Sequence, residues 1–402
     1  MKIRIQLAAL LGAALLSGAA AWAQPQRNLG NVSVVPAPAR VVSPEMNGSK
    51  TTFRIAAPQA INVSLHGSWM NTDDNCYGPL VQDANTQVIP LTRGADGVWS
   101  VTIDTPAAEL WTYNFYIDGV YTTDAANPLV QRDGLRLFSV LIVPGKLSEN
   151  YQGATQHGNV QMVWYNSPTL GFERRMYVYT PYGYEDAKNK KVNYPVLYLL
   201  HGGGCDEDTW ESMGRVTAII DNLIEKGKAT PMLVVMPNGN PTQSSSPFMQ
   251  ISAPEKAAEL RTVRNAYVNS LVKDIIPYVE SHYRVIKKKS ARAVSGLSMG
   301  GGHTLAVTAA YPDVFDYICP MGCGAREGDA EFLNGLLGIK KAGYKLYWLA
   351  AGTADFAYPG ASTLDKIMKD NGMPHTFYTK DGGHTWSNWR IFLNEMVPLL
   401  FK

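Results

Sequence analysis

The chain has 402 residues, of which 46% are hydrophobic and 17% are charged, and its formal net charge is +2 at pH 7. This is the composition of an ordinary globular protein, and the near-neutral charge excludes the strongly basic surface of a nucleic-acid-binding protein. The one basic cluster, Lys287-Lys288-Lys289, is interpreted as a solvated loop. Because the length exceeds a comfortable single core, we expect two domains.

The N-terminal segment has the pattern of a signal peptide. Lys2 and Arg4 precede an apolar run over residues 7–21, and Ala21-Trp22-Ala23 fits the small-x-small rule for cleavage. We therefore expect residues 1–23 to be removed and the mature protein to be secreted or periplasmic. The apolar run is too short for a membrane anchor, and no cysteine precedes Cys76 to carry a lipid.

Residues 24–45 are rich in Pro, Val and Ala and are predicted to form an extended leader. The following segment, residues 46–150, alternates apolar and polar side chains in several short runs, which is the period of half-buried strands. These runs cover residues 51–55, 61–65, 98–103, 113–117 and 136–143. Asp118-Gly119 marks a hairpin turn. The spacing of the strands predicts an all-β, immunoglobulin-like sandwich domain.

Residues 151–402 alternate strand patterns with helix patterns. The helical stretches cover residues 216–226, 264–283, 302–310 and 391–401. Such βα alternation predicts a mostly parallel, doubly wound sheet with helices on both faces. Residues 239–263 form an unusually long connection, typical of a functional loop, to which no role is assigned.

The stretch at residues 291–310 is the main chemical signal in the chain. A short apolar run leads into Gly-x-Ser-x-Gly at residues 296–300, and a small-residue helical segment follows. A serine on a sharp strand-to-helix turn exposes its hydroxyl, and the two glycines remove collisions with the neighbouring backbone. Ser298 is therefore the candidate nucleophile, and the amide of Met299 is a candidate oxyanion donor.

A second loop supplies the other oxyanion donor. An apolar strand pattern over residues 194–200 ends in His201-Gly202-Gly203-Gly204, a motif that commonly provides an N–H group opposite the nucleophile. We favour the amide of Gly203 for this role. His201 is interpreted as a residue that shapes the loop.

The candidate acid and base also follow strand patterns. Asp355 comes after the apolar run at 345–352, and His384 comes after the strand pattern at 376–380. The order Ser298, Asp355, His384 is the order that α/β-hydrolases use. Among the other histidines after Ser298, His303 and His375 are interpreted as packing or surface residues. Asp381 is kept as the alternative acid.

The cysteines give no metal site. The four cysteines, Cys76, Cys205, Cys319 and Cys323, lack the spacing of zinc ligands, and we expect mostly free, buried thiols. Neither a metal nor a cofactor is expected.

The catalytic half resembles carbohydrate esterase family one, the feruloyl and acetylxylan esterases, which are also similar to esterase D and the siderophore esterases. The resemblance covers residues 155–402 and rests on several motifs in the family's order. They stand at residues 198–204, 219–224, 234–238, 275–280, 296–302, 352–355 and 383–389. It implies the α/β-hydrolase fold, with Ser298, Asp355 and His384 as the triad and Met299 and Gly203 as the oxyanion donors.

Residues 46–150 resemble the glycogen-binding type of carbohydrate-binding module. The motifs that carry this likeness stand at residues 97–99, 113–119 and 124–128. Trp69, Trp111 and Tyr121 are candidates for stacking on sugar rings, with packing inside the protein as the alternative role for each.

Together the two resemblances imply a secreted serine esterase that acts on plant cell-wall polysaccharide, with feruloyl groups on arabinoxylan as the first choice. A feruloyl ring needs an apolar slot, for which Trp386, Trp210 and Phe356 are the candidates. Acetylxylan esterase and siderophore esterase are the alternative activities. A glycan-binding protein with an inactive hydrolase domain is the alternative outside enzymes.

Overall fold

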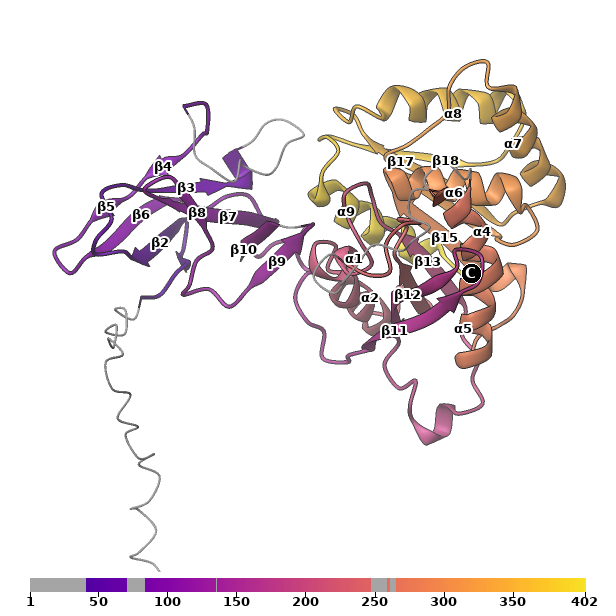
Figure 1. Cartoon of the computed structure of the whole chain (residues 1–402), viewed down its shortest axis with the longest axis horizontal. Coiled ribbons are helices and arrows are strands. Elements are labelled where there is room, and N and C mark those ends of the chain that lie inside the picture. The colour runs from indigo at the N-terminus through magenta and orange to yellow at the C-terminus, as the bar shows by residue number, and fades with distance from the viewer. Residues whose placement is uncertain (1–40, 71–83, 135, 247–258, 261–264) are drawn as a thin grey trace, which may run out of the picture. The chain divides into compact units, whose positions relative to one another are not determined.

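The computed structural model describes residues 41–70, 84–134, 136–246, 259–260 and 265–402 (Figure 1). The predicted signal peptide, most of the predicted leader, Cys76 and much of the loop at 239–263 lie outside the described residues. Residues 40–402 belong to one structural unit. Within the described part of the chain, no helix combines the length and the apolar character needed to cross a membrane.

The first part of this unit is a sandwich of two antiparallel sheets. One sheet has the order β1-β2-β6-β5, and the other has the order β4-β3-β7-β10-β9 with β8 paired to β7. The bounds are β1 Glu45–Asn47, β2 Lys50–Ala56, β3 Val63–Gly67, β4 Ile89–Pro90, β5 Thr92–Arg93, β6 Val98–Asp104, β7 Leu110–Ile117, β8 Val120–Thr122, β9 Val130–Asp133 and β10 Arg136–Ile142. The immunoglobulin-like sandwich predicted from the alternating pattern is confirmed.

Alternation explains how the two sheets share one core. Along β2, every second side chain is buried, so Phe53 and Ile55 face inward. In the other sheet Leu65 of β3 lies opposite Phe115 of β7, and both are fully buried. Strand β7 begins at Leu110, three residues before the predicted start, because residues 110–112 pair with β10.

The second part contains an eight-stranded sheet of order β11-β12-β14-β13-β15-β16-β17-β18. Strands β11, β12 and β14 pair antiparallel, and the pairs from β14 through β18 are parallel. The bounds are β11 Asn159–Ser167, β12 Phe172–Thr180, β13 Val196–Leu200, β14 Leu233–Pro237, β15 Arg292–Leu297, β16 Tyr317–Met321, β17 Leu346–Gly352 and β18 Thr376–Lys380. The domain boundary predicted at residues 150 and 151 falls between β10 and β11.

Helices cover both faces of this sheet (Figure 1). The buried side chains of β13 alternate: Leu197 and Leu199 pack with helices α1, α2 and α9, whereas Tyr198 and Leu200 pack with helices α4 to α8. The helices are α1 Thr209–Ser212, α2 Val216–Glu225, α4 Ala266–Ser270, α5 Ile276–His282, α6 Met299–Ala310, α7 Ala330–Ala342, α8 Tyr358–Asp370 and α9 Trp386–Met396. The doubly wound α/β arrangement predicted from the sequence is therefore confirmed.

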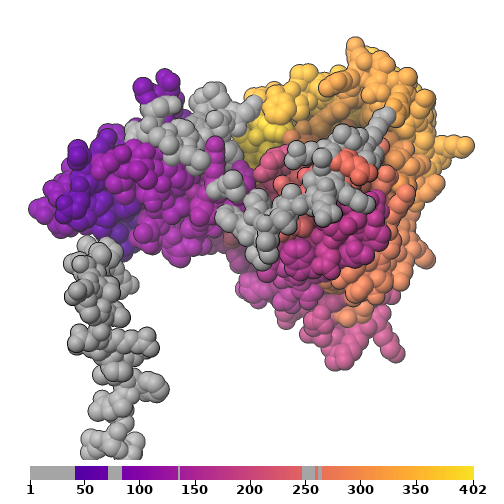
Figure 2. Space-filling view, viewed as in Figure 1, coloured from indigo at the N-terminus to yellow at the C-terminus, as the bar shows by residue number. Residues whose placement is uncertain are grey.

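Segments distant in the sequence share the surface of the α/β domain. In Figure 2, atoms coloured from magenta to yellow form a continuous body.

The order of the strands changes direction at β13, which lies between β14 and β15 in the sheet. The chain goes from β13 to β14 on one side, and then crosses back to β15 on the other side of β13. The carboxyl ends of strands at such a switch point are the usual place for a ligand site in an open α/β sheet.

A buried ion pair between Glu109 and Arg390 is one of the contacts that join the sandwich domain to the α/β domain. Arg390 of α9 is 2% exposed, and its Nη2 lies 3.1 Å from Oε1 of Glu109, which directly precedes β7. The same guanidinium donates to the carbonyls of Leu110 and Met213 at 2.9 and 3.0 Å. The charge of Arg390 is thus compensated by groups from both domains.

Candidate active site

Ser298 occupies a strained turn between β15 and α6. Its φ is +54° and its ψ is −114°, a backbone conformation that side-chain-bearing residues rarely adopt. The turn is held from both sides, because the Ser298 amide donates to the carbonyl of Met321 at 2.8 Å and its own carbonyl accepts from Gly302 at 2.9 Å. The geometry is that of a nucleophile elbow, as the Gly-x-Ser-x-Gly motif predicts.

The two glycines of the motif are required by close backbone approach. A Cβ atom on Gly296 would lie 2.5 Å from the carbonyl oxygen of Gly300. A Cβ on Gly300 would lie 2.5 Å from the oxygen of Leu200 and 2.6 Å from that of His201. Both positions therefore admit only glycine without a shift of the backbone, and Gly300 allows α6 to start against the end of β13.

Asp355 and His384 are brought together from the loops after β17 and β18. Nδ1 of His384 lies 2.9 Å from each carboxylate oxygen of Asp355. The carboxylate is 3% exposed and also accepts from the amide of Ala357 at 2.7 Å. An ionised carboxylate only accepts, so Nδ1 carries the proton and Nε2 is left as the basic nitrogen.

Gly322 lies beside this pair, one residue after the residue that contacts the serine. It follows Met321, whose carbonyl holds the Ser298 amide. A Cβ on Gly322 would lie 3.2 Å from Cε1 of His384 and 3.3 Å from Oδ2 of Asp355. Asp355 and His384 thus lie against Gly322, the residue after the one that holds the Ser298 amide, and all three side chains follow the carboxyl ends of strands from β15 to β18.

The loop after β13 lies against the elbow. A Cβ on Gly202 would lie 3.5 Å from Cβ of Ser298. His201 is buried, and its Nε2 accepts from the amide of Gly239 at 2.7 Å while Nδ1 lies 2.8 Å from the carbonyl of Gly202. This pattern requires the neutral tautomer with hydrogen on Nδ1. His201 therefore ties the glycine loop to the loop after β14, and burial lowers the pKa of its imidazole.

The predicted oxyanion donors belong to two elements, and their roles stay predictions. Met299 is the first residue of α6, and Gly203 is an exposed residue of the glycine loop. Sequence analysis did not identify the groups that hold this loop. These groups are three acidic residues that begin one residue after the loop, and two buried arginines, from β9 and β12, that bind them: Asp206, Glu207, Asp208, Arg132 and Arg175.

The three aromatic candidates for a ligand slot do not share one environment. Trp210 is 1% exposed and Trp386 is 5% exposed, and their rings meet edge to face with centroids 5.4 Å apart. Their burial corrects the expectation that they line a slot, because neither indole face is open to a ligand. Phe356 is 70% exposed, and its ring centroid lies 4.3 Å from that of His384.

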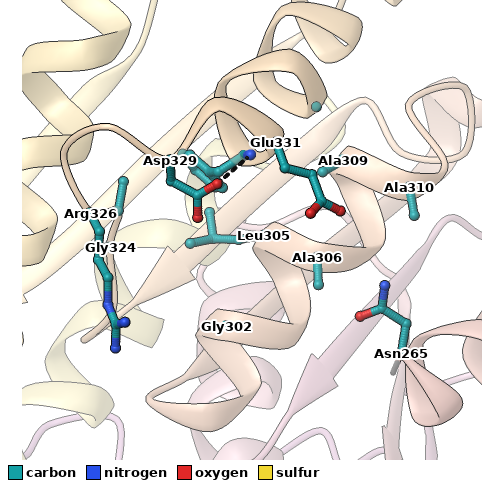
Figure 3. A pocket seen from close by; sticks show the side chains of 13 residues that line it. Asn265, Gly302, Leu305, Ala306, Ala309, Ala310, Gly324, Arg326, Asp329 and Glu331 are labelled. Atoms are coloured by element: carbon teal, nitrogen blue, oxygen red, sulfur yellow. Dashed lines mark hydrogen bonds between the residues drawn. The ribbon is translucent and has the colours of Figure 1, made fainter. Parts of the chain in front are cut away.

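A cavity of about 550 Å³ lies beside α6 and α7 (Figure 3). Gly302, Ala306 and Ala309 form its wall on α6, and Arg326, Asp329 and Glu331 bring charged groups from the β16–α7 connection and the start of α7. None of the predicted site residues lines it. Its role is left unassigned.

The described cysteines are free thiols, and their surroundings oppose reactivity. Burial raises the pKa of Cys323 to about 12 and also raises the pKa values of Cys205 and Cys319. Within the described residues, no group of three or more His, Cys, Asp or Glu side chains is placed to hold a metal ion.

Comparison with known proteins places this geometry in context. The model of a family described as putative esterase matches residues 167–323. An endo-1,4-beta-xylanase/feruloyl esterase of Xylanibacter ruminicola is 30% identical over 318 residues, which are 78% of this chain. The chain spans only 41% of the length of that relative.

Two solved structures share the fold at low sequence identity. A CE1 ferulic acid esterase from Anaeromyces mucronatus is 23% identical with a TM-score of 0.51, and the match covers 68% of this chain and 97% of that one. An enterobactin esterase from Shigella flexneri is 17% identical with a TM-score of 0.60, over 88% of this chain and 92% of that one.

Proposed function

Residues 167–323 match the model of a family described as putative esterase, and from that match we propose that the protein is a serine carboxylic ester hydrolase. Its proposed substrates are acyl groups esterified to plant cell-wall polysaccharide, with feruloyl groups on arabinoxylan first. Ser298, Asp355 and His384 act as the triad, and the amides of Met299 and Gly203 form the oxyanion hole.

The proposed mechanism assigns one step to each of these groups. Nε2 of His384 takes the proton from Ser298 as Oγ attacks the ester carbonyl. Asp355, whose Oδ1 lies 2.9 Å from Nδ1 of His384, orients the ring and stabilises the imidazolium. The two amides stabilise the oxyanion, and each such donor contributes roughly 3 kcal/mol in the transition state. The alcohol leaves with the proton from His384, and water then hydrolyses the acyl-enzyme by the same route.

The single observation that carries the proposal is the strained turn at Ser298, whose amide is held by the carbonyl of Met321, the residue before the glycine beside which Asp355 and His384 lie. A φ of +54° at Ser298 costs of order 1–3 kcal/mol and persists only where the surrounding structure enforces it. Such strain at a serine, together with a buried Asp–His pair at the ends of strands in the same sheet, supports nucleophilic catalysis more directly than a loop-forming role.

The substrate class rests on two observations. Phe356 offers an exposed aromatic face beside the proposed base, which suits a planar phenolic acyl group. The relative from Xylanibacter ruminicola carries feruloyl esterase in its name. Acetyl groups on xylan are the second choice, and siderophore esters are the third.

The proposal extends to export, because residues 1–23 have the signal-peptide pattern. Mass spectrometry of the protein purified from the outside of a producing cell should give a chain that begins at Gln24. A protein that keeps Met1 and remains in the cytoplasm would contradict export and leave the chemistry untouched.

The test of function is acid release from destarched arabinoxylan that carries both ferulate and acetate, with Ser298→Ala as the matched control. Ferulate released only by the parent protein is the expected result. Acetate alone would shift the assignment to acetylxylan. Release of neither acid, followed by hydrolysis of a catecholate siderophore ester, would overturn the polysaccharide assignment. Glycan binding without turnover of any ester would indicate an inactive hydrolase domain.

A further inference from the structure

The loop that carries Gly203 is followed, after Cys205, by three acidic residues. Two of them, Asp206 and Glu207, are each 1% exposed, and Asp208 is partly buried. A buried carboxylate is costly unless it is paired and hydrogen-bonded. The conformation of this segment therefore depends on the cations that compensate it.

Asp206 and Asp208 share one guanidinium, and it comes from the sandwich domain. Arg132 of β9 is 8% exposed; its Nη1 and Nη2 lie 2.8 and 2.6 Å from the two carboxylate oxygens of Asp206. Nη2 also lies 2.5 Å from Asp208, and Nη1 donates to the carbonyl of Gly134 at 2.7 Å. A two-pronged contact of this kind fixes orientation as well as charge.

Among the described residues, the groups that hold Glu207 belong to the α/β domain. Its Oε1 accepts from Nε of Arg175 on β12 at 2.8 Å and from the amide of Ser246 at 2.8 Å, and its Oε2 accepts from Asn238 at 2.9 Å. Consecutive carboxylates are thus bound by arginines from different domains. The segment after the glycine loop is clamped between them.

The turn that follows β9 also touches the glycine loop directly. A Cβ on Gly134 would lie 3.2 Å from the carbonyl oxygen of Gly204. The thiol of Cys205 lies 3.6 Å from Oδ1 of Asp133. The backbone one residue after Gly203 therefore has a neighbour from the sandwich domain.

We infer that Arg132 of the sandwich domain is a positioning residue for the oxyanion hole, acting through Asp206 and Asp208 on the loop that presents the Gly203 amide. The inference rests on the proposed function. Arg132 would then contribute to the hydrolysis of every ester substrate. This includes small esters without a sugar, to which a glycan-binding surface could not contribute.

The kinetic test uses the full chain with Arg132→Ala, Arg132→Lys and Glu109→Gln. Glu109→Gln is the matched control, because it removes the other buried interdomain ion pair. Neither Glu109 nor its partner Arg390 belongs to the glycine loop or to the acidic segment that follows it. With p-nitrophenyl acetate, Arg132→Ala should lower kcat by roughly 10- to 100-fold with KM changed little, since misplaced oxyanion donors weaken only transition-state binding. Arg132→Lys should recover part of the loss, and Glu109→Gln should stay within about twofold of the parent.

A second readout does not depend on turnover. Hydrogen–deuterium exchange of peptides over residues 200–206 should be faster in Arg132→Ala than in the parent and unchanged in Glu109→Gln. If Arg132→Ala fails to fold, the triple variant Arg132→Met with Asp206→Asn and Asp208→Asn removes all three charges together, and it should show the same loss of kcat.

The outcomes are distinguishable. Unchanged kcat and unchanged exchange in a folded Arg132→Ala protein would overturn the inference, as would an equal loss in Glu109→Gln, which would indicate general destabilisation. A parent protein without esterase activity would refute the proposed function. Exchange at residues 200–206 would then still decide whether Arg132 positions the loop.

Discussion

Nδ1 of His384 lies 2.9 Å from both carboxylate oxygens of Asp355, and this carboxylate is almost completely buried. Replacement by Asn would keep the shape but offer an amide that no longer favours hydrogen on Nδ1. We expect Asp355→Asn to lower kcat by roughly 10³- to 10⁴-fold on p-nitrophenyl acetate, while the melting temperature changes little.

Asp381→Asn is the matched control for this variant, since Asp381 is the exposed carboxylate three residues before His384. It should keep near-parent activity. Loss of activity in Asp381→Asn, with Asp355→Asn still active, would reverse the choice of acid.

Gly300→Ala tests the close approach of α6 to the glycine loop. The added methyl would lie 2.5 and 2.6 Å from two carbonyl oxygens that cannot move without displacing β13 or the loop. We expect the free energy of unfolding to fall by about 1–3 kcal/mol, with a loss of kcat beyond what the stability change explains.

Gly302→Ala supplies the comparison on the same helix. Beyond the backbone of its own helix, a Cβ there has no heavy atom of the described residues within 4 Å, and alanine is the better helix former. The substitution should leave activity intact and raise stability by up to about 1 kcal/mol. Equal behaviour of the two variants in urea unfolding would refute the steric argument.

Phe356→Ala tests the proposed acyl slot. Because the ring is exposed, stability should change by less than about 0.5 kcal/mol. Loss of an aromatic contact should raise KM for methyl ferulate by roughly 3- to 10-fold and affect p-nitrophenyl acetate less. An equal effect on both esters would argue that the ring supports His384 and does not bind an acyl group.

Trp386→Ala should behave in the opposite way, because Trp386 is buried among other aromatic rings beneath the His384 loop. We expect a loss of about 3–5 kcal/mol in the free energy of unfolding, measured with urea. Unaltered stability together with weaker binding of methyl ferulate would restore Trp386 to the slot.

Burial of His303 should make part of the free energy of unfolding sensitive to acid. Its ring packs against Tyr267, and burial lowers its pKa to about 4. The unfolded chain takes up the proton near pH 6.5, so the free energy of unfolding falls as pH drops from 6.5 to 4, and the loss reaches about 2 kcal/mol at pH 5. Below pH 4 the folded state is protonated as well, and this contribution stays lost.

Urea unfolding of the parent and His303→Gln at pH 7.5 and pH 5 measures this effect. The variant should lose less stability than the parent between the two pH values. If the parent and the variant lose the same free energy of unfolding between the two pH values, the protonation of His303 is the same in the folded and unfolded states.

Local pattern was sufficient for much of the fold and the candidate site. The Gly-x-Ser-x-Gly motif predicts the elbow because close backbone approach at Gly296 and Gly300 leaves no alternative residue. Strand ends predict where Asp355 and His384 emerge, since parallel strands place their carboxyl ends at one edge of the sheet.

Side-chain direction and long-range pairing were beyond that reasoning. Trp210 and Trp386 have the chemistry of a ligand slot, but only the packing of α1 against α9 reveals that their rings are buried. Arg132 and Asp206 are 74 residues apart and belong to different domains. No spacing rule connects them, because their pairing depends on how the two domains meet.

The buried pair of Glu109 and Arg390 bears on how this architecture can be recombined. Exchanging the sandwich for one without an acidic residue at the position of Glu109 would leave a guanidinium that is 2% exposed without its counter-charge. In a chimera with a different sandwich domain, the unpaired Arg390 would therefore lower the free energy of unfolding by several kcal/mol. We therefore expect the two domains to occur together in related proteins, and an engineered protein should keep them together.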